Sequence, residues 1–133
     1  IDILARFVSE DTIVYMHCHD TDDEHYADLA AMREQLAGFT TAEGRPYRLV
    51  ALPWPEARLN RFGQRLAPSY ANFLIINDAV LVPVYGDEAD AEALDVLAEC
   101  FPKRVIVAVP CSPLIEQGGS LHCMTMQLPA GVL

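Results

Sequence analysis

Cys123 and the two glycines before it are the residues of this chain best suited to do chemistry. Residues 116–125 read Glu-Gln-Gly-Gly-Ser-Leu-His-Cys-Met-Thr. Glycine can take positive φ and lets the backbone pass close to a ligand, and the short run around Cys123 predicts a strand. A thiol just after such a turn is well placed to face a cleft, where its thiolate would be a nucleophile. The alternative is a small buried hydrophobe, the commonest fate of free cysteine, and the spacing alone favours it.

Residues 118–125 also resemble the nucleophile motif of the agmatine deiminase and Porphyromonas-type peptidylarginine deiminase family. That motif usually reads Gly-Gly-Gly-Asn-(Ile/Leu)-His-Cys-(Ile/Met)-Thr, so the chain differs from it at Gln117 and Ser120. Residues 69–73, Ser-Tyr-Ala-Asn-Phe, and 83–87, Pro-Val-Tyr-Gly-Asp, are similar to two further stretches of the family. Residues 1–8, Ile-Asp-Ile-Leu-Ala-Arg-Phe-Val, resemble its His-(Val/Ile)-Asp-x-x-(Ala/Cys)-x-Phe-Val. The order and spacing of the four stretches match the C-terminal part of the family.

The resemblance implies a hydrolase that works through a covalent cysteine adduct. Cys123 would be the catalytic nucleophile, and Asp2, Asn72 and Gly119 would bind the substrate. In deimination a thiolate attacks the guanidinium carbon, ammonia leaves, and water then hydrolyses the adduct. The carboxylate of Asp2 suits this substrate because it can accept two parallel N–H bonds from a guanidinium group. The resemblance implies no cofactor and no metal.

The family's catalytic histidine would fall directly before Ile1, outside this sequence. His122 is not expected to replace it, because neighbouring residues of a strand point to opposite faces. We therefore expect this chain by itself to be inactive. Three functions stay open. The first is an agmatine deiminase that makes N-carbamoylputrescine and ammonia for putrescine and polyamine synthesis. The second is a peptidyl-arginine deiminase that makes citrulline. The third is a non-catalytic fragment or module used for interaction.

The elements that must position these residues repeat along the chain. A helix is predicted at 22–37, begun by a capping box of Thr21 and Glu24 and ended by Gly38 in a left-handed conformation. A second amphipathic helix is predicted at 89–100. The β-rich and apolar runs predict six strands, with the last buried on both faces: 3–8, 12–17, 47–52, 70–76, 80–85 and 104–109.

Each half of the chain therefore reads as a β-β-α-β unit, which predicts an α/β (α+β) fold. The resemblance implies the pentein fold, a five-bladed α/β propeller, of which this chain would supply about two ββαβ blades. We expect residues 1–133 to be the C-terminal portion of one such domain. Its parts would be repeat 1 at about 1–55, a connection at 56–68, repeat 2 at about 69–115 and the nucleophile strand at 116–133.

Composition limits the partners of this chain. Its formal net charge of −10 over 133 residues argues against nucleic acid and anionic membrane surfaces. That charge suits a small cationic guanidine such as agmatine, or a peptidyl-arginine. The longest apolar runs are of strand length, so no membrane-spanning helix is predicted. The apolar faces of two blades should pack on the rest of the propeller, and a homo-oligomer is compatible with the sequence.

The cysteine pattern indicates reduced thiols and a cytoplasmic protein, because the four cysteines form no CxxC pair. Residues 17–20, His-Cys-His-Asp, contain metal-ligand types. On a strand end the two histidines face one side and the cysteine the other, so a zinc site is not expected there.

Overall fold

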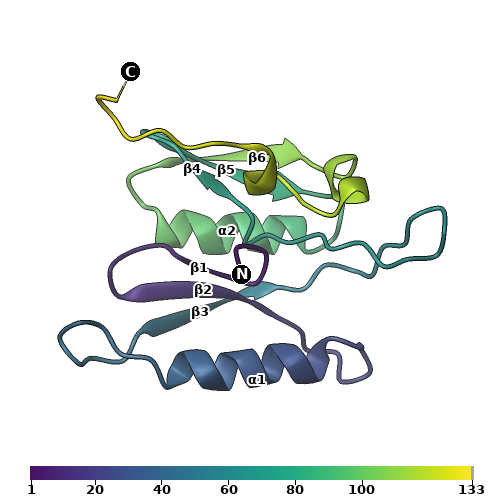
Figure 1. The fold of residues 1–133 in the computed structure, drawn as a ribbon, viewed down its shortest axis with the longest axis horizontal. Coiled ribbons are helices and arrows are strands. Elements are labelled where there is room, and N and C mark those ends of the chain that lie inside the picture. Colours follow the sequence, from purple (N-terminus) through teal and green to yellow (C-terminus); the bar gives the residue numbers. More distant parts are fainter. Residues whose placement is uncertain (133) are drawn as a thin grey trace.

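The computed structural model describes residues 1–132, which form two successive β-β-α-β units (Figure 1). The first unit contains β1 (Ala5–Phe7), β2 (Thr12–His17), α1 (Tyr26–Ala37) and β3 (Arg48–Pro53). The second contains β4 (Leu74–Ile75), β5 (Ala79–Val84), α2 (Asp90–Cys100) and β6 (Val105–Pro110). Two 3₁₀ turns follow, η1 (Leu114–Gln117) and η2 (His122–Met124). The predicted α/β class and the repeated order of elements are confirmed.

Both sheets have the same topology. The middle strand pairs antiparallel with the strand before it and parallel with the strand after the helix, in the orders β1-β2-β3 and β4-β5-β6. Ala5 lies opposite Tyr15 in the first sheet, and Leu74 lies opposite Leu81 in the second. The parallel pair needs a crossover connection, which the helix of each unit provides. The two units are consistent with two blades of the expected propeller.

The elements lie in four layers, in the order α1, first sheet, α2 and second sheet (Figure 1). β2 explains this order, because both of its faces are apolar. Ile13 and Tyr15 pack in a cluster with Leu36 of α1. Val14 and Met16, which alternate with them, belong to the larger core that includes α2 and the second sheet. The helix of the second unit therefore covers the open face of the first sheet.

The ends of α1 differ from the prediction. The helix begins at Tyr26 rather than at residue 22, because the aspartates before it form turns instead of a capping box. Asp23 accepts a hydrogen bond from the backbone N–H of His25 at 2.8 Å. Gly38 has φ −82° and ψ −10°, so the predicted left-handed stop is wrong. The backbone N–H groups of Gly38 and Phe39 close the last turn on the carbonyls of Gln35 and Leu36.

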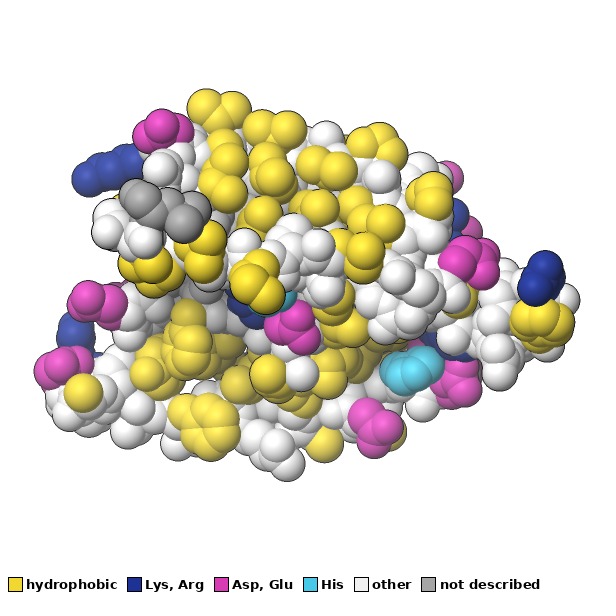
Figure 2. Space-filling view, turned by 45° about the horizontal axis from the view of Figure 1, so that its top comes forward, with side chains coloured by type: hydrophobic (Ala, Val, Ile, Leu, Met, Phe, Trp, Pro, Cys, Tyr) yellow, Lys and Arg dark blue, Asp and Glu magenta, His cyan; other side chains and the backbone are white. Residues whose placement is uncertain are grey.

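The predicted double burial of β6 is also wrong. The side chain of Val105 is 64% exposed and that of Val107 39% exposed. Ile106, which points the other way, is partly buried and packs against the core cluster that includes residues of α2. In the described residues, the face of the second sheet opposite α2 thus keeps an apolar surface. Figure 2 shows the apolar side chains gathered over this part of the molecule. They are the side chains expected to pack on a further layer.

The helices of residues 1–132 do not include one that is both long and apolar enough to cross a membrane.

Candidate active site

Asp2 lies in the turn that leads into β1. The backbone N–H groups of Leu4 and Ala5 both donate to the carbonyl of Ile1, at 2.8 and 3.0 Å. The carbonyl of Leu4 then accepts from Met16, at the end of β2. This turn therefore fixes Asp2 at one end of the first sheet, with its side chain 37% exposed.

Asn72 is fully buried just before β4. The prediction of a strand over 70–76 fails here, because the backbone of 69–73 makes its hydrogen bonds outside the sheet. The N–H of Asn72 donates to the carbonyl of Ser69 at 3.2 Å, which closes a turn. The carbonyl of Asn72 accepts from the N–H of His122 at 3.2 Å. The segment is thus tied to η2 instead of to a neighbouring strand.

Cys123 lies in η2 and is exposed. The predicted nucleophile strand is wrong, because the chain turns twice here. Gly118 ends η1 with φ 88°, a conformation that glycine tolerates best. Gly119 packs against Cys123: a Cβ atom at this position would lie 2.8 Å from the Cβ and 3.3 Å from the Sγ of Cys123. Gly119 therefore gives room to Cys123.

The predicted divergence of His122 and Cys123 is also wrong. In a 3₁₀ turn successive side chains are about 120° apart, since three residues complete the turn, rather than opposed as on a strand. Both side chains consequently reach the carboxylate of Asp2. His122 Nδ1 lies 3.0 Å from Asp2 Oδ2, and Cys123 Sγ lies 3.7 Å from the same oxygen.

Asp2, Asn72 and Cys123 thus converge, although 121 positions of sequence separate the first from the last. Asn72 holds the other two together. Its Nδ2 donates to both the carbonyl and Oδ2 of Asp2, each at 3.2 Å. Its Oδ1 accepts from the backbone N–H of Cys123 at 3.4 Å. The structure therefore brings together three of the predicted site residues, with Gly119 packed against the thiol.

The carboxylate of Asp2 is held in its charged form. The hydrogen bond from His122 lowers the pKa of Asp2, and the charge of His122 and the hydrogen bond from Cys123 act in the same direction. Partial burial opposes them without reversing the shift. The contacts from His122, Asn72 and Cys123 all use Oδ2, and Oδ1 makes none of them. A negative oxygen next to a thiol can receive a cationic guanidinium.

A buried chain of hydroxyl groups joins the three segments behind the site. Tyr85 Oη lies 2.7 Å from Ser120 Oγ, donates to the carbonyl of Ser69 at 3.0 Å and accepts from the N–H of Ser69 at 2.9 Å. Ser69 Oγ donates in turn to the carbonyl of Ile3, next to Asp2. Burial raises the pKa of Tyr85 to about 12, so this hydroxyl stays protonated. The chain links the loops that carry Asp2, Asn72 and Cys123.

Residues 17–20 lie elsewhere, along a hollow of about 770 Å³ at the ends of β2 and β3. The rings of His17 and His19 meet edge to face at 4.3 Å, while Cys18 is buried and its Sγ faces the carbonyl of Asp20 at 3.5 Å. Among residues 1–132, no group of three or more His, Cys, Asp and Glu side chains could hold a metal ion. All four cysteines are free.

Sequence reasoning missed the part of His122 in the site. The glycine pair was the signal that could have revealed it. Glycine permits tight turns as well as close approach to a ligand, so the residues after it could form a turn instead of a strand. The roles of Tyr85 and Ser120 were missed for another reason. Their hydroxyl groups come into contact only after the second unit has folded, and no spacing in the sequence predicts that contact.

Comparisons with known proteins identify the family of this chain. Residues 1–129 match the family described as Porphyromonas-type peptidyl-arginine deiminase. A Selenomonas ruminantium protein named "Putative agmatine deiminase" is 36% identical over 98% of this chain and 40% of its own length. The crystal structure of a "Putative Arginine Deiminase" from Porphyromonas gingivalis is 52% identical, with a TM-score of 0.95 over 98% of this chain and 38% of that one.

A second similar structure is a cysteine-to-serine variant of C. jejuni agmatine deiminase with substrate bound. It is 36% identical, with a TM-score of 0.82 over 91% of this chain and 34% of that one. The chain spans about 40% of the Selenomonas relative and less of the two solved proteins. The match over residues 1–129 and the shared fold lead to one conclusion: this chain belongs to the Porphyromonas-type peptidyl-arginine deiminase family.

Proposed function

We propose that the full-length protein carrying this chain is a guanidino-group hydrolase that converts agmatine to N-carbamoylputrescine and ammonia. The observation that carries the proposal is the meeting of Asp2, Asn72 and Cys123 around one carboxylate oxygen. It is supported by relatives named as agmatine deiminases. The two units of this chain would be two blades of a five-bladed propeller. The chain would divide into repeat 1 at about 1–55, a connection at 56–68, repeat 2 at about 69–115 and the segment that carries Cys123 at 116–133.

In this proposal Cys123 Sγ, as thiolate, forms a bond to the guanidinium carbon and the C–N bond to one terminal nitrogen breaks. That nitrogen leaves as ammonia after it takes up a proton. Water then attacks the same carbon, loses a proton, and the C–S bond breaks to return the thiolate and release the ureido product. Asp2 would hold the guanidinium through charge-assisted hydrogen bonds. Asn72 would hold Asp2 and the backbone of Cys123 in a fixed position relative to each other.

The acid/base is assigned by resemblance to a histidine two positions before Asp2. A positioned histidine typically contributes about 10²–10⁴-fold to such proton transfers. His122 is held on Asp2 Oδ2 and would orient that carboxylate. We therefore expect the isolated 133-residue chain to give no ureido product where the full-length protein does.

The decisive test is Cys123→Ser in the full-length protein, assayed by colorimetric detection of the ureido product. A hydroxyl group has no thiolate-like form at neutral pH, so turnover should fall by more than about 10³-fold. Binding of agmatine, measured by calorimetry, should remain. Cys100→Ser is the matched control, because Cys100 lies at the end of α2. Turnover of Cys123→Ser near the wild-type rate would reject the covalent mechanism.

Peptidyl-arginine is the second candidate substrate. It is favoured by the description of the matching family, which names peptidyl-arginine. The same colorimetric assay, run in parallel on agmatine and on a short peptide with a central arginine, separates the two. A higher kcat/KM on the peptide would move the assignment to a peptidyl-arginine deiminase. Turnover of neither would favour the non-catalytic module.

A further inference from the structure

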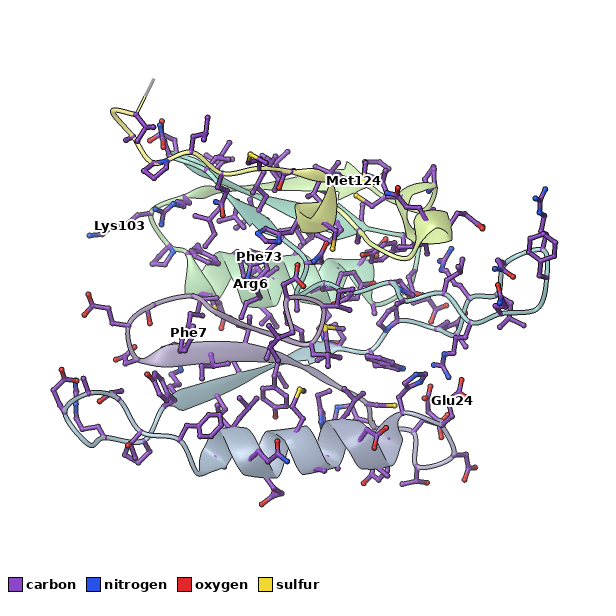
Figure 3. All side chains as sticks on the ribbon, in the orientation of Figure 1. Arg6, Phe7, Glu24, Phe73, Lys103 and Met124 are labelled. Carbon is purple, nitrogen blue, oxygen red and sulfur yellow. The ribbon has the colours of Figure 1, made fainter. Side chains whose placement is uncertain are left out.

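Arg6 on β1 is a half-buried cation that the proposed mechanism does not use. Its NH1 atom donates to the carbonyl of Phe73 at 2.9 Å and faces that of Ala71 at 3.5 Å. Its guanidinium lies 4.7 Å from the centre of the Phe73 ring, close enough for a cation–π contact. Figure 3 shows Arg6 and Phe73 next to each other, between the first sheet and the second unit. An arginine of the first unit thus binds the backbone of the second.

The two carbonyls belong to the residues on either side of Asn72. They are the groups that a strand over 70–76 would have used in a sheet, and Arg6 takes them instead. The side chain of Asn72 in turn bonds Asp2 and the backbone of Cys123. A movement of this segment would therefore move both. Arg6 is thus connected to the site indirectly, through Asn72, the residue that links the carboxylate of Asp2 to Cys123.

We propose that Arg6 is a positioning residue of this site. Its guanidinium fixes the backbone around Asn72 and supplies the positive charge that stabilises the carboxylate of Asp2 and the thiolate of Cys123. The proposal rests on the proposed function only in naming Cys123 as the group that reacts.

The electrostatics of the site agree with this role. Burial lowers the pKa of Arg6, while the charges of Asp2 and Cys123 act in the opposite direction, so both groups sense the guanidinium. The attraction is mutual, and a guanidinium stays charged at all relevant pH values. Two other ionisable groups face Asp2: His122, which contacts Oδ2, and the amino group of Ile1, 3.9 Å from Oδ1.

The test measures the alkylation rate of Cys123 by iodoacetamide at pH 7 in the full-length protein. Mass spectrometry of the Cys123 peptide separates its alkylation from that of the other cysteines. Arg6→Gln keeps a hydrogen-bond donor but removes the charge. The alkylation rate should fall about tenfold, because a nearby opposite charge shifts a pKa by about one unit or more. Arg6→Lys keeps the charge, and its rate should stay within about twofold of wild type. Arg33→Gln, on the surface of α1, is the control for net charge.

A rate for folded Arg6→Gln within twofold of wild type would overturn the proposal, because a purely structural arginine would change stability and leave the thiolate population alone. If Arg6→Gln does not fold, the kinetics of Arg6→Lys test the proposal instead. One ammonium group cannot hold both carbonyls, so kcat on agmatine should fall at least about tenfold with KM little changed. A wild-type kcat in Arg6→Lys would overturn the proposal. Absence of deiminase activity in the wild type would reject the proposed function, while the alkylation rates would still decide the role of Arg6.

Discussion

Replacement of Gly119 by alanine gives a sharp test of how Cys123, the proposed nucleophile, is positioned. The φ of Gly119 is outside the left-handed region, so alanine fits its backbone conformation. The new methyl group, however, would lie 2.8 Å from Cys123 Cβ and 3.3 Å from Cys123 Sγ. Normal carbon–carbon contacts are roughly 3.5–4.0 Å. The side chain of Cys123 would therefore have to move by about 1 Å, and a displacement of that size at a reacting group costs about 10²-fold in rate.

We expect Gly119→Ala in the full-length protein to lose about 10²-fold in kcat/KM on agmatine. Its free energy of unfolding, measured with urea, should fall by about 1–3 kcal/mol, as is usual for overpacking. Ureido-product kinetics measure the first quantity.

Gly118→Ala is the matched control, because it separates backbone strain from contact with Cys123. Gly118 has φ +88°, and among the described residues nothing lies within 4 Å of the position of an added Cβ. This variant should lose about 1–2 kcal/mol of stability through backbone strain, with a smaller effect on turnover than Gly119→Ala. A folded Gly119→Ala protein with kcat/KM within threefold of wild type would refute the argument that Gly119 makes room for Cys123.

Two further predictions concern stability and association. Asp23 is nearly buried and its pKa is lowered, first of all by the hydrogen bond from Arg65 at 2.6 Å. The stability from this carboxylate is therefore present above its unfolded pKa of about 3.9 and is lost as the pH falls through the lower folded value. In the full-length protein, Asp23→Asn should reduce the loss of unfolding free energy, measured with urea, as the pH is lowered. An unchanged loss at acid pH would contradict this assignment. Val105→Lys should reduce aggregation of the isolated chain in light scattering, because it places a charge on the exposed edge strand β6. Equal scattering by both chains would show that another surface causes association.

Local pattern determined most of the elements. The β-rich run of residues 12–17 predicts β2 with its observed bounds, and α2 begins at Asp90, one residue from its predicted start. Both depend on interactions between near neighbours along the chain, which spacing and propensity express. The predicted meeting of Asp2, Asn72 and Cys123 came from the resemblance of their motifs, and the geometry agrees with it.

Tertiary structure decided what those motifs do in detail. The backbone around Asn72 is not a strand, because Arg6 and His122 take its carbonyl groups. Cys123 lies in a 3₁₀ turn that Asn72 holds through a backbone bond, and this turn brings His122 to Asp2. β6 has the composition of a buried strand, yet one of its faces is exposed, because burial depends on which layer lies next to the sheet. Each of these outcomes comes from contacts between residues far apart in the chain, and these contacts form only when the two units pack together.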